Sequence, residues 1–187
     1  MSSGPGYALG SGTPPGWTPQ QIILYQLSME FDGSLEYVYL SGSGTTTSTD
    51  INSFIQSLVD GTPSASGPLP SGQTPPDLIV TVPCYVVVQL DSSINWAFEP
   101  SVAPILTQNN LATKYCALNL VDSSGNIYPA TAPSSPNCLI LYFSVVSVAP
   151  STEDVNDPFN YYFQFTTSSG THNVILDPEM KNRGPGG

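Results

Sequence analysis

Apolar and polar residues alternate in several segments of the chain, which is the pattern of β-strands that bury one face. The first such segment covers residues 23–31, with apolar residues at every second position: Ile23, Tyr25, Leu27, Met29 and Phe31. The sequence Asp32-Gly33-Ser34 predicts a turn, so residues 35–40 should return as the second strand of a hairpin.

The longest apolar segment covers residues 77–91. One face of this strand is predicted to be core, and it carries Leu78, Val80, Val82, Cys84, Val86, Val88 and Leu90. Pro83 cannot donate to a sheet ladder, so it marks an edge or a bulge. The length and the proline together predict a strand that bends and serves two sheets.

Further strands follow toward the C-terminus. Residues 137–150 are apolar on both faces, which predicts a central strand covered on both sides. Residues 114–122 place Cys116, Leu118 and Leu120 on one face, and a short strand is expected near Trp96. Residues 158–167 and 171–178 predict a second hairpin, with Phe159, Tyr161, Phe163 and Phe165 facing the core.

One segment has helical spacing instead. Residues 51–60 place apolar side chains three and four apart, which predicts a short amphipathic helix that begins after Asp50 and stops at Gly61. A Pro/Gly/Ser-rich loop over 62–76 follows. With no strand–helix alternation, the chain is predicted to be all-β: an antiparallel β-sandwich, jelly-roll or immunoglobulin-like, of about seven or eight strands.

The 187 residues suit one domain, which we place at 21–178, between a Gly/Pro/Ser-rich N-terminal arm over 1–20 and a C-terminal tail over 179–187. Trp17 is large and apolar for a linker, so we expect it to dock on its own domain or on a neighbouring subunit. Lys181 and Arg183 are the only basic pair, and they suit contacts between this tail and an acidic neighbour.

The charge composition then excludes several classes of function. The chain has 14 acidic and 3 basic residues, for a formal net charge of -11, and only 9% of its residues are charged. Nucleic-acid binding needs clustered Lys and Arg, so it is not expected, and no apolar run is long enough to span a membrane. No basic start or apolar stretch follows Met1, which favours a cytoplasmic or virion-associated protein over a secreted one.

Catalytic groups are scarce. His172 is the only histidine, no nucleophile motif accompanies it, and we expect an ordinary strand residue there. Glu30, Asp32 and Glu36 flank one hairpin turn, and we expect them to be a solvated acidic turn. Cys84, Cys116 and Cys138 lack metal-binding spacing and are expected to be free buried thiols, with a single Cys84–Cys116 bridge as the alternative.

Residues 151–158 are predicted to form an acidic loop that could hold calcium. Four side chains there offer oxygen ligands: Glu153, Asp154, Asn156 and Asp157. Over the four residues 154–157, and no further, the order resembles the linker motif of cadherin-type domains. The simpler interpretation is a charged loop that keeps a sheet edge soluble.

These observations favour a non-enzymatic structural protein. We expect a subunit that self-assembles or decorates a larger particle, such as a virion, filament or inclusion, through its arms and charge-poor surface. The alternative is a lectin-like or calcium-dependent binding module that uses residues 153–157 and exposed tyrosines, with a glycan as partner.

Overall fold

The computed structural model describes residues 6–27, 35–40, 48–61, 78–98, 103–130, 138–146, 154–177 and 179–183. The side chains of residues 35–40, 48–50, 154, 179 and 181–183 lie outside this description. The turn at 32–34, the loop at 62–76 and Glu30 also lie outside it.

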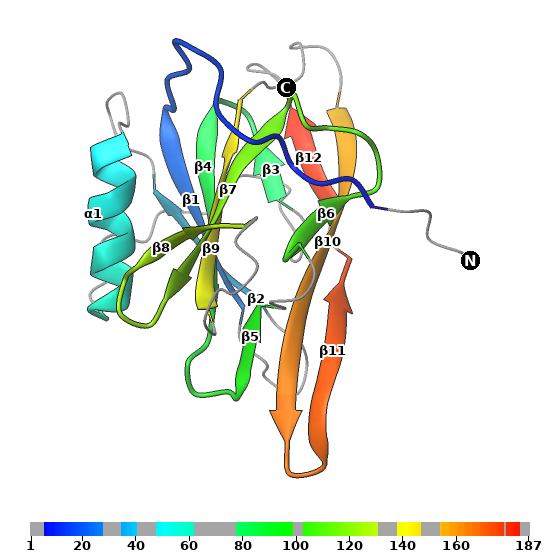
Figure 1. Cartoon of the computed structure of the whole chain (residues 1–187). Coiled ribbons are helices and arrows are strands. Elements are labelled where there is room, and N and C mark those ends of the chain that lie inside the picture. Colours follow the sequence, from blue (N-terminus) through cyan, green and yellow to red (C-terminus); the bar gives the residue numbers. More distant parts are fainter. Residues whose placement is uncertain are drawn as a thin grey trace.

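The described residues form two β-sheets, with one helix against the outside of the first (Figure 1). The first sheet has the order β2 (Leu35–Leu40), β1 (Gln21–Leu27), β4 (Cys84–Leu90), β9 (Cys138–Val145), β7 (Tyr115–Asp122) and β8 (Ile127–Pro129). The second has the order β11 (Gly170–Leu176), β10 (Asp154–Thr167), β12 (Glu179–Arg183) and β3 (Leu78–Val80). β5 (Trp96–Phe98) and β6 (Ile105–Thr107) pair with β10 on the side opposite β11.

The all-β prediction with a single helix is confirmed, and two details differ from it. The described ranges contain twelve strands rather than seven or eight, because several three-residue strands are too short to show alternation. The sheets are also mixed rather than antiparallel, since β1 pairs with β4, and β12 with β3, in parallel.

The predicted strand over 77–91 does serve both sheets. It is interrupted at residues 81–83, so that β3 lies in the second sheet and β4 in the first. Pro83 ends the irregular stretch, and its carbonyl accepts a hydrogen bond of 2.7 Å from the backbone N–H of Gln20. β9 lies in the middle of the first sheet and is buried on both faces, as predicted.

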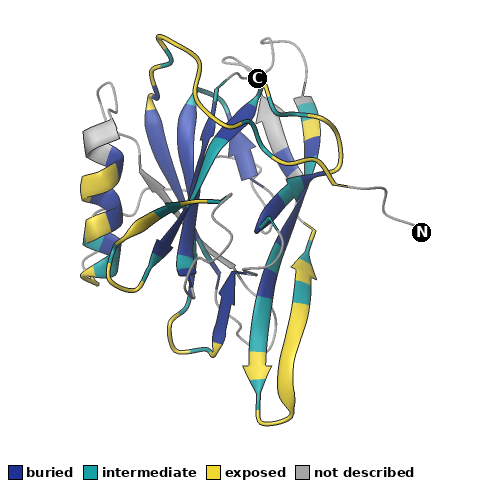
Figure 2. Ribbon diagram, viewed as in Figure 1, coloured by how far each residue is buried: buried dark blue, intermediate teal, exposed yellow. Residues whose placement is uncertain are grey.

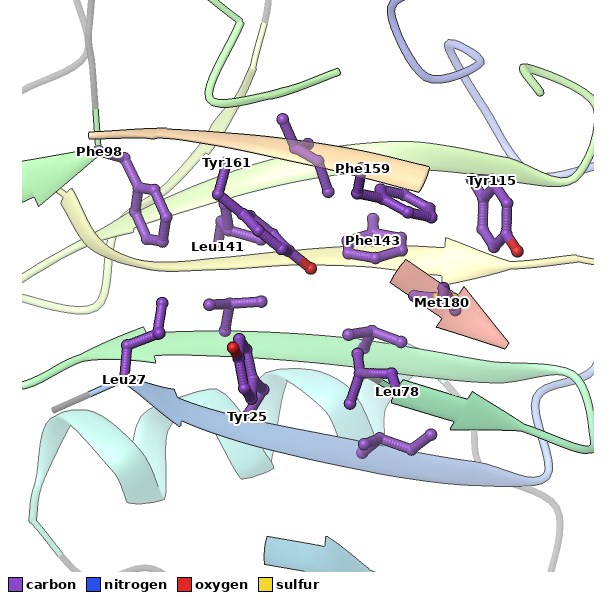
Figure 3. Packing of buried hydrophobic residues seen from close by; sticks show 14 of the residues in the cluster. Tyr25, Leu27, Leu78, Phe98, Tyr115, Leu141, Phe143, Phe159, Tyr161 and Met180 are labelled. Atoms are coloured by element: carbon purple, nitrogen blue, oxygen red, sulfur yellow. The ribbon is translucent and has the colours of Figure 1, made fainter. Parts of the chain in front are cut away.

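One continuous core lies between the two sheets (Figure 3). Both sheets contribute aromatic rings to it: Phe143 of β9 lies 5.9 Å from Phe159 of β10, and Tyr25 of β1 lies 6.3 Å from Tyr161 of β10, measured between ring centroids. Apolar burial of this kind contributes about 25 cal/mol per Å² of area removed from water, so this cluster is the main source of stability.

A second apolar cluster covers the outer face of the first sheet. Helix α1 (Ser48–Val59) places Ile51, Ile55 and Leu58 against residues of β1, β4, β7 and β9. The helix begins at Ser48, so Asp50 lies inside its first turn and is not the residue before it. It ends at Val59, and the predicted stop Gly61 follows two residues later with a φ of 71° that few other residues adopt readily.

β7 does not keep the predicted alternation. Ala117 has a φ of 55°, and the pairing of β7 with β9 shifts between Cys116 and Asn119. This bulge places Tyr115 and Leu120, rather than Cys116, in the core between the sheets. The face predicted from Cys116, Leu118 and Leu120 is therefore wrong at Cys116.

The described parts of both terminal segments, residues 6–20 and 179–183, lie against the domain itself. In the arm, Tyr7 pairs with Thr107 of β6 and Gly10 pairs with Cys116 of β7, so the arm contacts both sheets. Residues 179–183, predicted as part of a tail, form β12 between β10 and β3. Met180 is 2% exposed in the core, which explains why this polar segment is held in the sheet.

Candidate functional site

β11 is exposed along most of its length, whereas its hairpin partner β10 is largely buried (Figure 2). Phe159, Tyr161 and Phe163 bury one face of β10, and this anchors the hairpin to the core. The turn after Thr167 reaches Gly170, whose φ of 131° favours glycine. In Figure 1 the tip of the hairpin extends past β5, and β11 is the outermost strand of its sheet.

Along β11, residues whose backbone N–H and C=O bond to β10 alternate with residues whose N–H and C=O point outward. Two N–H groups of β10 point away from β11: Thr166 donates to the Asn95 carbonyl at 2.8 Å, and Tyr162 donates to the Pro104 carbonyl at 2.9 Å. Their partners across the hairpin are Thr171 and Ile175. In an antiparallel pair, the residue opposite such a position also directs its N–H and C=O away from the partner strand. The backbone groups of Thr171 and Ile175 therefore point away from β10.

The same alternation places Asn173, opposite Gln164, in this outward-pointing set. Thr171, Asn173 and Ile175 are all exposed, and Ile175 is 58% exposed. No described strand pairs with this side of β11. We call the backbone groups of these three residues the outer edge of β11.

The strand that carries this outer edge also has no charged side chain. Residues 158–176 contain no Asp, Glu, Lys or Arg, and the nearest charge beyond β11 is Asp177. Natural proteins usually blunt exposed edges with charged side chains, prolines or bulges. None of these devices is present from Gly170 to Leu176.

The predicted calcium residues lie in a strand and not in a loop from residue 154 onward, because β10 begins at Asp154 and pairs with β12. Asp157 is 2% exposed on the core side, while Asn156 is exposed. Neighbouring strand residues point to opposite faces, so these two side chains do not converge on one ion. Glu153 and the side chain of Asp154 lie outside the described residues.

Asp157 instead forms the centre of a buried polar contact between the sheets. Its Oδ2 lies 2.7 Å from Nζ of Lys114, and the same oxygen accepts a hydrogen bond from the Tyr115 hydroxyl. Tyr115 is the first residue of β7 in the first sheet and Lys114 directly precedes it, whereas Asp157 lies in β10 of the second sheet. This contact could not be predicted from a local pattern, since 43 residues separate Lys114 from Asp157.

The described ranges contain no group of three or more His, Cys, Asp or Glu side chains suited to a metal ion. Calcium binding stays a prediction.

The predicted arm residues make contacts within the chain. Trp17 donates from Nε1 to the Val145 carbonyl at 3.2 Å, and its ring packs edge-on against Tyr85 at 5.1 Å. Of the two docking surfaces expected for Trp17, it occupies the one on its own domain. Lys181 and Arg183 lie in the backbone ladder of β12, where they pair with Asn156 and Asp154.

The structure also places His172 and the three cysteines, for which no catalytic role is expected. His172 is exposed on β11, and its Nε2 lies 3.5 Å from Oγ1 of Thr167. All three cysteines are buried thiols outside any disulfide, as predicted. Burial raises the pKa of Cys138 to about 11, which keeps this thiol protonated at neutral pH.

A small cavity of about 160 Å³ lies between the arm and the two sheets. Its lining includes Leu9, Ile105 and Leu118 and has no titratable side chain among the described residues. Ligand sites usually have 300–1,000 Å³, so this cavity is small even for a modest ligand. The only described helix has 12 residues and is too short to cross a bilayer.

Comparison with protein-family models and with curated proteins finds no match for this chain.

Proposed function

We propose that this protein is a non-enzymatic structural subunit that assembles by strand addition along the outer edge of β11. One observation carries the proposal: a seven-residue edge strand has exposed, outward-pointing backbone groups and no charge. Strand addition to such an edge gains main-chain hydrogen bonds without desolvating an ionised side chain.

The charge distribution supports assembly at this edge. The chain carries a net charge of -11, so copies repel one another over most of their surfaces. A stretch without charge from 158 to 176 is where another chain can approach at the lowest electrostatic cost. The docked N-terminal arm supports the same choice, because Trp17 is engaged on its own sheet.

The proposal is tested by following assembly across a range of protein concentrations, using sedimentation velocity and negative-stain electron microscopy. We expect species larger than the monomer to grow with concentration. The informative variant is Asn173→Pro, because it removes an outward N–H that is not used in the hairpin.

Asn173→Ala is the matched control, because it keeps that N–H and removes the same side chain. Both variants should retain the wild-type circular dichroism spectrum. We expect Asn173→Pro to abolish assembly and Asn173→Ala to preserve it. Monomers of the wild-type chain at every concentration would refute the proposal, and so would assembly by folded Asn173→Pro equal to that of wild type.

A further inference from the structure

The partner of the outer edge of β11 can be specified further, on the basis of the proposed function. We propose that β11 pairs with β11 of a second copy of this chain, antiparallel and centred on Asn173. The two copies would then share one continuous sheet across a twofold axis. The second sheet of each copy would extend through β11 into that of the other.

The outward backbone groups fit this register. With Asn173 opposite its own copy, Thr171 lies opposite Ile175 of the second copy, and Ile175 opposite its Thr171. All three pairs use residues whose N–H and C=O point outward, as argued from the β10–β11 pairing. Each such pair exchanges two hydrogen bonds, so the contact makes about six.

The side chains fit the same register. Thr171 and Ile175 are both β-branched, a combination that packs well across strands. Between the outward positions, His172 lies opposite Val174 of the second copy. No two charged side chains face each other, because Gly170–Leu176 contains none and Asp177 falls opposite Ser169. A chain of net charge -11 therefore pairs with itself here without opposing like charges.

A contact between single strands buries less than the roughly 1,000 Å² of a stable interface, so the pair is expected to be weak on its own. A covalent trap suits a weak contact. The three native thiols are buried, so a cysteine placed on β11 is the thiol available for oxidation in the folded protein.

Asn173→Cys tests the centre of the register. In a hydrogen-bonded antiparallel pair, the Cα atoms lie about 5.5 Å apart, which is the usual separation in a disulfide. Under mild oxidation we expect a covalent dimer on a non-reducing gel, formed at least about tenfold faster than by Thr171→Cys or Ile175→Cys alone.

The two flanking variants test direction and register. When Thr171→Cys is the only variant present, the new thiols of the two paired copies lie four residues apart along the strands, or about 14 Å. This variant should therefore not link to itself. Mixed in equal amounts, Thr171→Cys and Ile175→Cys should form the heterodimer. Self-linking of Thr171→Cys would indicate either parallel pairing or antiparallel pairing centred on Thr171, and both would overturn the inference.

The failure of this inference can be told apart from failure of the proposed function. If the wild-type chain assembles and folded Asn173→Cys forms no dimer, the register is wrong while strand addition stands. If the wild-type chain stays monomeric and none of the cysteine variants links, both fail. Circular dichroism of each reduced variant establishes that it is folded before oxidation.

Discussion

The buried contact between Lys114 and Asp157 gives a sharp stability prediction. The Lys114 side chain is 19% exposed and that of Asp157 is 3% exposed, with 2.7 Å between Nζ and Oδ2. Lys114→Met keeps most of the aliphatic stem and removes the charge. It leaves a carboxylate that is almost fully buried and that still accepts a hydrogen bond from the Tyr115 hydroxyl.

The cost follows from this geometry. Removing one partner of a buried ion pair costs about 3–5 kcal/mol. The Tyr115 hydrogen bond remains, and water can reach the partly exposed position of the lysine, so we expect a smaller loss of about 2–3 kcal/mol. For a chain of this size, that loss lowers Tm by about 5–10 °C.

The assay is urea unfolding followed by circular dichroism, with Asp177→Asn as the control for loss of an exposed charge. The control should change the unfolding free energy by less than about 0.5 kcal/mol. The double variant Lys114→Met with Asp157→Leu should recover most of the loss, because it removes the buried charge as well. A loss below about 0.5 kcal/mol for Lys114→Met would refute the reasoning.

Three further predictions concern the turn after β7, the thiols and the arm. Hydrogen bonds from Asn126 and its neighbours lower the pKa of Asp122 below 3.8, so its stabilising effect is full above that pH and is lost as the pH falls through its folded-state pKa. The difference in unfolding midpoint between wild type and Asp122→Ala should therefore shrink below about pH 4, and a constant difference down to pH 2 would contradict this cause. Burial raises the pKa of Cys138 to about 11, so a thiol reagent at pH 8 should label this cysteine only after unfolding, and rapid labelling of the native chain, detected by mass spectrometry, would show that the thiol is accessible. A Cβ at Gly10 would lie 2.2 Å from the Ala112 carbonyl oxygen, whereas one at Gly12 meets nothing within 4 Å. Gly10→Val should release the arm and remove hydrogen-exchange protection at the Ala117 amide, which donates to the Gly10 carbonyl, while Gly12→Val should leave that protection unchanged.

Sequence patterns predict a feature of a strand correctly where that feature depends only on the residues of the strand itself. The alternation from Phe159 to Phe163 reports a face that is buried whatever the neighbouring strands are. Pro83 removes a donor wherever it stands, so the interruption between β3 and β4 could be predicted from one residue. Both features are local and do not depend on strand order.

Features set by distant partners could not be predicted in this way. Residues 179–183 are polar except for Met180, and only their placement between β10 and β3 makes them a strand. The bulge at Ala117 shifts the alternation of β7 without leaving a glycine or proline as a signal. Parallel pairing of β1 with β4 depends on the route of the chain between them.

The candidate site likewise combines a local feature, which can be read from the sequence, with a feature that depends on distant strands. The absence of charge over 158–176 is visible in the sequence. That β11 is the outermost strand depends on which strands flank β10, and this follows from long-range pairing. Adjacent oxygen-bearing side chains favour a calcium site in the sequence. In β10, however, the side chains of Asn156 and Asp157 point in opposite directions.

The position of β12 has a consequence for biosynthesis. β12 is the last described strand in the chain, yet it joins β3, near residue 80, to β10. During translation, β3 must wait for about a hundred further residues before its neighbour emerges from the ribosome. Until then Leu78 and Val80 lack the strand that holds them to the second sheet, so the nascent chain passes through a stage at which chaperones can bind it.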